Sequence, residues 1–186
     1  TSRIAYLVGG GHAQPHEVLA VTFTNKAAEE MRSRVEALLG SDCSRMWVST
    51  FHSLCARLLR REAPAIGLSR DFVIYDSSDQ LSVVKQALKE LQIDDSFVQP
   101  RAALSRISHA KNRMETPDQM ASSAGWNRRD ENIAKVYAKY IAALKEASAL
   151  DFDDLLLKTV DLFEQSLAVR QKYSEQFRFV MVDEYQ

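Results

Sequence analysis

The sequence lacks the motif G-x-x-x-x-G-K-[ST], the phosphate loop by which many nucleotide-binding proteins hold phosphate groups. It has only two cysteines, Cys43 and Cys55, which form no C-x-x-C pair and have no histidine at ligand spacing. A disulfide framework and a zinc site are therefore excluded, and a reduced cytoplasmic compartment is the expected location. No apolar run approaches the length of a membrane span and no signal peptide is recognisable, so we expect no membrane partner.

An excess of charge is also missing, because 24 Lys and Arg are balanced by 25 Asp and Glu, for a formal net charge of −1. A wholly basic surface is excluded, so any nucleic-acid contact must come from local patches or from uncharged and aromatic groups. A composition of 46% hydrophobic and 26% charged residues is ordinary for a globular chain. The length of 186 residues fits one domain with or without an insertion. Because the chain begins at Thr1 without methionine, we expect a piece excised from a longer protein.

The first part of the chain alternates between short apolar runs and helical patterns. Residues 18–23 and 46–50 have the composition of buried strands, and residues 72–75 form a third extended run. Each of the first two runs leads into a helix, the first capped at Thr24 and Asn25. The buried face of that first helix is expected to carry Ala28, Met31, Val35, Leu38 and Leu39. Three glycines at residues 9–11 follow a helix and precede no Lys-Thr or Lys-Ser, which indicates a helix stop.

From residue 76 the pattern becomes entirely helical. A cap cluster at residues 76–79 begins an amphipathic helix, and further helices are predicted over residues 101–112 and 133–147. The last of these should bury a face that includes Ile141. A helix follows Leu150, and the apolar residues before Asp183 form a final strand. The order predicts an α/β fold with a parallel sheet, interrupted by an all-helical insertion.

Polar and aromatic side chains follow each predicted strand. Asp183 could hold Mg²⁺ through water and Glu184 could orient or deprotonate an attacking water, although acidic residues at a strand end are common without any such role. After the first strand, Phe23 could stack a base while Thr24, Asn25 and Lys26 hold a phosphate. A plain helix cap with Phe23 in the core is the alternative.

The second strand is followed by Thr50, Phe51 and His52 at a similar junction. If the two junctions leave the same edge of one parallel sheet, they would form a continuous platform. Taken alone, His52 could equally be a helix-start residue with no ligand. The acids at 151, 153 and 154 resemble a helix cap and first turn more than a metal site.

Four segments in this order carry a specific resemblance to a known family. They are VTFTNKAAEEMRSRV, STFHSLCARLLRR, ALDFDDLLL and VMVDEYQ. Together they closely resemble motifs Ia, Ib, Ic and II of the superfamily 1 DNA helicases of the UvrD/Rep/PcrA group. The segment IGLSRDFVIYDSSDQLSVVK also looks like that family's connection into a helical insertion.

The resemblance implies part of a RecA-like P-loop NTPase domain, in residues 1–75 and 149–186, with a helical subdomain at 76–148. Such enzymes use ATP and Mg²⁺ to move 3′ to 5′ along single-stranded DNA and to open duplex junctions, and they need a second RecA-like domain of the same chain. It further implies that Asp183 holds Mg²⁺, Glu184 activates water and Gln186 couples nucleotide state to the DNA track.

The track itself would consist of residues that follow the first two strands, namely Phe23, Thr24, Asn25, Lys26, Thr50, Phe51 and His52. Duplex phosphates could be contacted by four basic residues of the helical block, Arg101, Arg106, Lys111 and Arg113, for which a solvated helical face is the alternative.

The phosphate loop, the adenine-contacting region and the downstream motifs of the family are missing from these 186 residues. We therefore expect a fragment of an ATP-dependent helicase. The whole protein would act in DNA repair or replication, and the fragment by itself would be inactive. A catalytically dead single-strand-binding module and the motor of a helicase–nuclease fusion are the alternatives.

Overall fold

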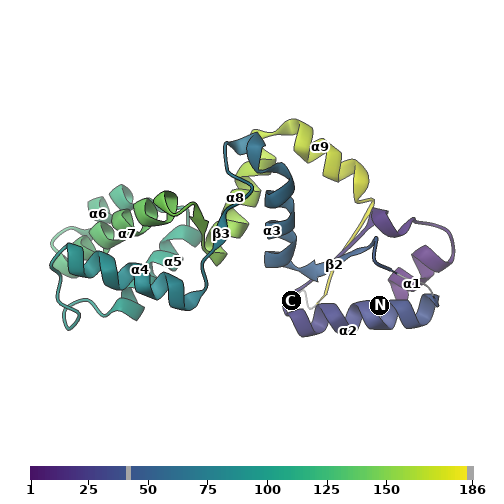
Figure 1. The fold of residues 1–186 in the computed structure, drawn as a ribbon, viewed down its shortest axis with the longest axis horizontal. Helices are drawn as coiled ribbons and strands as arrows, with labels where there is room; N and C mark the ends of the chain where they lie inside the picture. Colours follow the sequence, from purple (N-terminus) through teal and green to yellow (C-terminus); the bar gives the residue numbers. More distant parts are fainter. Residues whose placement is uncertain (41–42, 184–186) are drawn as a thin grey trace. The chain divides into compact units, whose positions relative to one another are not determined.

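A computed structural model describes residues 1–40 and 43–183 (Figure 1). The chain divides into two compact units. The sheet unit comprises Thr1–Leu68 and Thr159–Gln186, and the helical unit comprises Ser69–Lys158.

The sheet unit alternates strands and helices along the chain. Its elements are α1 (Ser2–Gly9), η1 (Pro15–Glu17), β1 (Val18–Thr22), α2 (Asn25–Leu39), β2 (Trp47–Thr50), α3 (Phe51–Glu62), η2 (Ala63–Ile66), α9 (Leu167–Gln176) and β5 (Phe179–Val182). Strands β1, β2 and β5 form a parallel sheet in the order β2-β1-β5. The register aligns Leu19 with Trp47 and with Val180, so these three side chains share one face.

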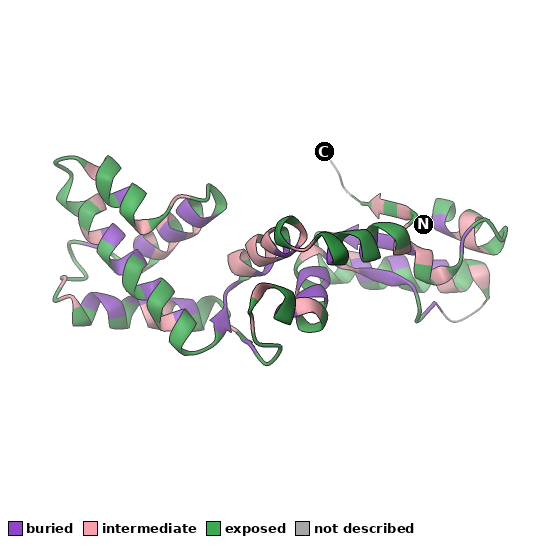
Figure 2. Cartoon of the chain, turned by 90° about the horizontal axis from the view of Figure 1, so that it is seen from above, coloured by how far each residue is buried: buried purple, intermediate pink, exposed green. Residues whose placement is uncertain are grey.

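Helices cover both faces of this sheet. Val18, Ala20 and Val48 form one core with residues of α1 and α2, and Phe179 and Met181 pack against it. On the other face, the Trp47 ring contacts Tyr173 of α9 and Phe177 at centroid distances of 6.1 and 5.0 Å. Figure 2 shows the buried residues on the inward sides of the elements in each unit. The outcome is a three-layer α/β/α arrangement.

The helical unit packs its helices around one apolar core. Its elements are β3 (Val73–Ile74), α4 (Ser77–Glu90), α5 (Pro100–Asn112), α6 (Pro117–Ala124), α7 (Arg128–Glu146) and β4 (Ala149–Leu150). Helix α8 (Phe152–Gln165) begins in this unit and ends in the sheet unit. The buried core of the helical unit includes Val84, Leu88, Ile107, Met120 and Tyr140, so all four helices from α4 to α7 contribute to it.

The predicted strands, caps and principal helices are confirmed. Residues 76–148, all of which are described, contain no strand. Three short or weakly patterned elements, α6, β4 and α9, were not predicted. Two burial predictions are wrong, because Leu38 is 60% exposed and Ile141 is 40% exposed. The chain thus has a small parallel sheet among many helices, while the domain limits and the insertion remain predictions.

Candidate functional site

The carboxyl ends of three parallel strands meet at one edge of the sheet. Thr22 and Thr50, the last residues of β1 and β2, lie opposite each other in the register. Asp183 follows β5 and its backbone N–H donates to the carbonyl of Val21 at 2.9 Å. The residues that follow the three strands are therefore neighbours in space, and we refer to this edge as the strand-end site.

At the β1–α2 junction, local hydrogen bonds hold the residues on both sides of Phe23, and the Phe23 side chain faces solvent. Thr22 is buried, and its hydroxyl donates to the carbonyl of Thr24 at 3.0 Å. The Thr24 hydroxyl caps α2 by accepting from the N–H of Ala27 at 3.2 Å. Phe23 between them is 56% exposed, so the alternative that placed it in the core is excluded.

The β2–α3 junction repeats this design. Thr50 is buried and caps α3, because its hydroxyl oxygen accepts from the N–H of Ser53 at 3.2 Å. That cap places Phe51 at the first helical position, half-buried, with His52 exposed beside it. The Phe51 ring lies 5.3 Å from the Phe23 ring, tilted by 49°. Two junctions 28 positions apart in sequence thus present one aromatic surface.

A hollow of about 300 Å³ adjoins the two junctions. Its lining includes Asn25 and Thr50, which were predicted, and Arg32 and Ser53, which were not. Arg32 reaches from α2 to donate to the carbonyl of Val48 at 2.7 Å. Sequence reasoning missed Arg32 because the partner lies 16 positions away on a different element. Lys26 is exposed in the first turn of α2, where the helix N-terminus adds to its positive potential.

Asp183 is exposed directly after β5. Glu184 and Gln186 lie outside the described residues. A single exposed carboxylate fits Mg²⁺ held largely through water, since that ion prefers oxygen ligands and keeps several waters. Among the described residues, no group of three or more His, Cys, Asp or Glu side chains could hold a metal directly.

The four basic residues predicted in the helical unit differ in their environments. Arg101 and Arg113 are exposed. Arg106 is partly buried and makes two hydrogen bonds to the Glu115 carboxylate, at 3.0 and 3.2 Å. Such a forked pair holds the guanidinium in place and uses two of its five N–H donors, which leaves fewer donors for a phosphate.

The prediction for Lys111 needs correction. Its side chain is 6% exposed, and its Nζ lies 2.7 Å from both Asp151 and Asp154. The Tyr140 hydroxyl also donates to Asp151, at 2.8 Å. A buried ammonium held by two carboxylates cannot meet a phosphate at the surface, so Lys111 belongs to the internal structure of the helical unit.

The acids around the start of α8 have the structural role predicted for them. Asp151 caps the helix by accepting from the N–H of Asp154 at 2.8 Å. Burial, partly offset by Lys111, raises the pKa of Asp154, and the Asp151 charge adds to the rise. Burial and the Asp151 charge likewise raise the pKa of Tyr140, which keeps its hydroxyl a donor.

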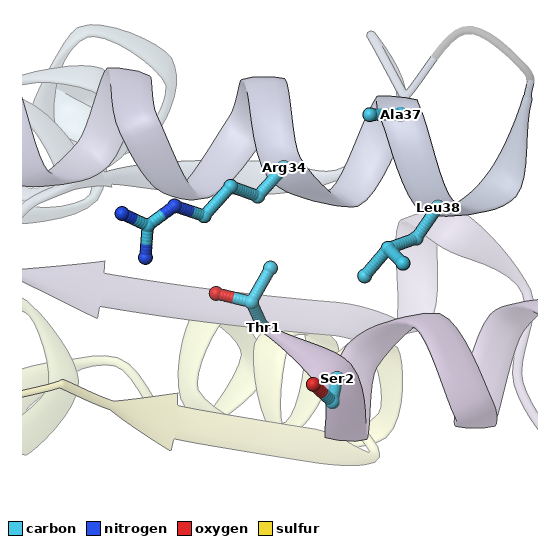
Figure 3. A pocket seen from close by; sticks show the side chains of 5 residues that line it. All are labelled: Thr1, Ser2, Arg34, Ala37 and Leu38. Atoms are coloured by element: carbon cyan, nitrogen blue, oxygen red, sulfur yellow. The ribbon is translucent and has the colours of Figure 1, made fainter.

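A second hollow, of about 470 Å³, lies between α1 and α2 (Figure 3). It is lined by Thr1, Ser2, Arg34, Ala37 and Leu38, and the Arg34 and Leu38 side chains project from α2 on the side of Thr1 and Ser2 (Figure 3). Arg34 also pairs with Glu30 at 3.5 Å. None of the predicted site residues lines this hollow.

Parallel strands with capped, polar junctions at one edge and helices on both faces define a partial α/β domain of the RecA-like kind. The chain belongs to the UvrD/REP helicase family, because the family model for the UvrD/REP helicase N-terminal domain matches residues 1–186. Its relatives include the ATP-dependent DNA helicases PcrA of Bacillus subtilis and Leuconostoc citreum, each 46% identical over the whole chain. The PcrA of Staphylococcus epidermidis is 44% identical. The chain spans about a quarter of the length of these relatives.

No helix among the described residues is long and apolar enough to cross a membrane.

Proposed function

We propose that this chain is part of an ATP-dependent DNA helicase, in which the strand-end site forms a section of the single-stranded DNA track. The observation that carries the proposal is the pairing of the exposed Phe23 with the half-buried Phe51, whose rings lie 5.3 Å apart at the carboxyl edge of the sheet. Adjacent aromatic rings beside hydroxyl, amide and ammonium groups suit a single strand, because bases stack on rings while polar groups hold the backbone.

The remaining parts of the site would serve the nucleotide. Asp183 would hold Mg²⁺ through water, and Glu184 would activate the hydrolytic water. Gln186 would report the nucleotide state to the track. Bound ATP with Mg²⁺ would supply the energy of phosphoryl transfer. The whole protein would move 3′ to 5′, open single-strand/duplex junctions, and require the second RecA-like domain of the same chain.

The helical unit would lie near the duplex ahead of the junction. Arg101 and Arg113 remain the candidates there for phosphate contacts, because both are exposed. A role in DNA repair or replication, and a place with the chromosome in the bacterial cytoplasm, are part of the same proposal and rest on DNA as the partner.

The track is tested by measuring single-stranded DNA affinity of the chain by fluorescence anisotropy at low salt. Phe23→Ala and His52→Ala should each weaken binding, with roughly 1–3 kcal/mol lost at the stacking position. Tyr6→Ala is the matched control, since Tyr6 is 67% exposed on α1 and lies outside the site. An unchanged affinity in both site variants, with the fold intact by circular dichroism, would remove the track from the proposal.

A further inference from the structure

Two arginines of α3 lie over the ring of Trp47, on the face of the sheet covered by α3 and α9. The Cζ atom of Arg57 is 3.7 Å from the ring centroid, and that of Arg61 is 5.0 Å from it. One turn of helix separates the two residues, so both side chains project from the same side of α3. Trp47 is buried beneath them, while both arginines are exposed.

The two guanidinium groups lie over one ring without an acidic partner. Neither has a carboxylate within ion-pair distance in the part of the chain that the structure describes. Glu62, the next residue along α3, accepts instead from Lys172 and from the Tyr173 hydroxyl. Burial and the positive charge of the neighbouring Arg61 lower the pKa of Arg57, because both disfavour its charged form.

The arrangement is suited to binding an anion. An arginine stacked on an aromatic ring keeps its N–H donors at the edge of the guanidinium, where they can bind two oxygens at once. Two such groups side by side match the oxygens of a phosphate, and a phosphate would relieve the repulsion between them. The ring below fixes both side chains, so little conformational entropy would be lost on binding.

We propose that Arg57 and Arg61 bind a phosphate group of the nucleic-acid backbone at a second site, separate from the strand-end site. Trp47 begins β2 and Thr50 ends it, so the arginines lie toward the opposite end of the strand. The identity of the ligand as nucleic acid rests on the proposed function. Phosphate is preferred over an acidic peptide because the chain belongs to a family of DNA helicases.

The first experiment uses Trp47 as a reporter and does not depend on DNA. Trp126 is the other tryptophan and is fully exposed, so Trp126→Phe leaves only Trp47 to fluoresce. Inorganic phosphate is titrated at constant ionic strength, with chloride as the replaced anion. We expect a saturable change in Trp47 emission that disappears when Arg57→Gln and Arg61→Gln are combined.

Two further variants separate a site from a simple loss of charge. Arg170→Gln removes one positive charge from an exposed position on α9 of the same unit and should preserve the full response. Arg57→Lys keeps the charge but loses the fork, and should leave a weakened response. Urea unfolding of every variant shows whether the sheet unit remains folded.

The second experiment measures how DNA affinity depends on salt. The double variant should lower the slope of log affinity against log salt by roughly 0.7 for each single-strand phosphate that the protein no longer neutralises. Phe23→Ala should reduce affinity while leaving this slope nearly unchanged. Loss of binding in the Phe23 variant with an unaltered slope in the arginine variant would retain the track and overturn the second site.

If the chain binds no DNA at all, the phosphate titration still tests the second site separately from the proposed DNA track. A phosphate response that is absent, or equally strong in the double variant, would overturn the second site whatever becomes of the track. A response to oligoglutamate without one to phosphate or DNA would also overturn it, in favour of an acidic protein ligand.

Discussion

The Lys111 side chain is 6% exposed and lies between two carboxylates, so its charge is removed from water, unlike that of a surface lysine. Taking three charges out of water is costly, and their mutual attraction offsets the cost only while all three are present. The Tyr140 hydroxyl supplies a further hydrogen bond to Asp151. This cluster joins the end of α5 to the start of α8, whose positions differ by 40 residues in sequence.

Replacement of Lys111 by methionine should destabilise the helical unit by about 3–5 kcal/mol, because it leaves two buried carboxylates without their cation. Urea unfolding followed by circular dichroism measures the change. Lys139→Met is the matched control, since Lys139 pairs with Glu90 at 3.2 Å but is 48% exposed, and it should change stability little. Equal effects of the two variants would show that Lys111 is not a structural charge.

The same variant should also show a defined pH dependence. The pKa of Asp154 is already raised by burial, which means that the folded chain binds this proton more tightly than the unfolded chain. Removing Lys111 raises the pKa of Asp154 further, because the carboxylate loses its cation. Lowering the pH toward this raised pKa should therefore stabilise the folded variant. The loss caused by Lys111→Met should therefore be smaller at pH 5 than at pH 7.

At the scale of elements, side-chain caps determine where helices begin. The structure has capping hydrogen bonds at Thr24, Thr50 and Asp76, all within three residues in sequence. Such signals are local, which is why the starts of α2, α3 and α4 could be predicted. Helix α6 has the same kind of cap at Thr116, but it is short and was missed because its apolar pattern is weak.

Thr116→Ala tests whether this cap holds α6. The Thr116 hydroxyl accepts from the N–H of Gln119 at 3.2 Å, and the Gln119 side chain accepts in return from the N–H of Thr116. The substitution should lower the free energy of unfolding by about 1 kcal/mol. Ser122→Ala, within the same helix, should have no such cost because alanine suits a helix interior. A stability loss confined to the Ser122 variant would contradict the assigned cap.

At the scale of the whole molecule, each compact unit has a core of its own. The core of the sheet unit depends on strands joined across the sequence, whereas that of the helical unit uses helices that follow one another. In the sheet unit, Val180 is 60% exposed and Val182 is 38% exposed along β5. The side chains proposed for the single-stranded DNA track and for Mg²⁺ lie at the carboxyl ends of the strands of this unit, whereas Arg101 and Arg113 belong to the helical unit.

The 186 residues by themselves should not hydrolyse ATP above background, with or without single-stranded DNA. The physical reason is that no G-x-x-x-x-G-K-[ST] segment is present to hold the β- and γ-phosphates. Phosphate release is measured beside that of full-length PcrA from Bacillus subtilis. A rate well above background that falls in Asp183→Asn would contradict the prediction, because contaminating activity would not respond to that substitution.

The sequence by itself determined the family, the order of the principal strands and helices without α6, β4 and α9, and the polar junctions after β1 and β2. These follow from local patterns, because caps and apolar periodicity act over a few residues. Tertiary structure alone decided that Phe23 meets Phe51, that Lys111 is buried, and that Arg57 and Arg61 share the ring of Trp47. The reason is that burial and charge pairing depend on which distant segments pack together. A basic residue on a helix reads alike in sequence whether it faces water, a carboxylate or an aromatic ring.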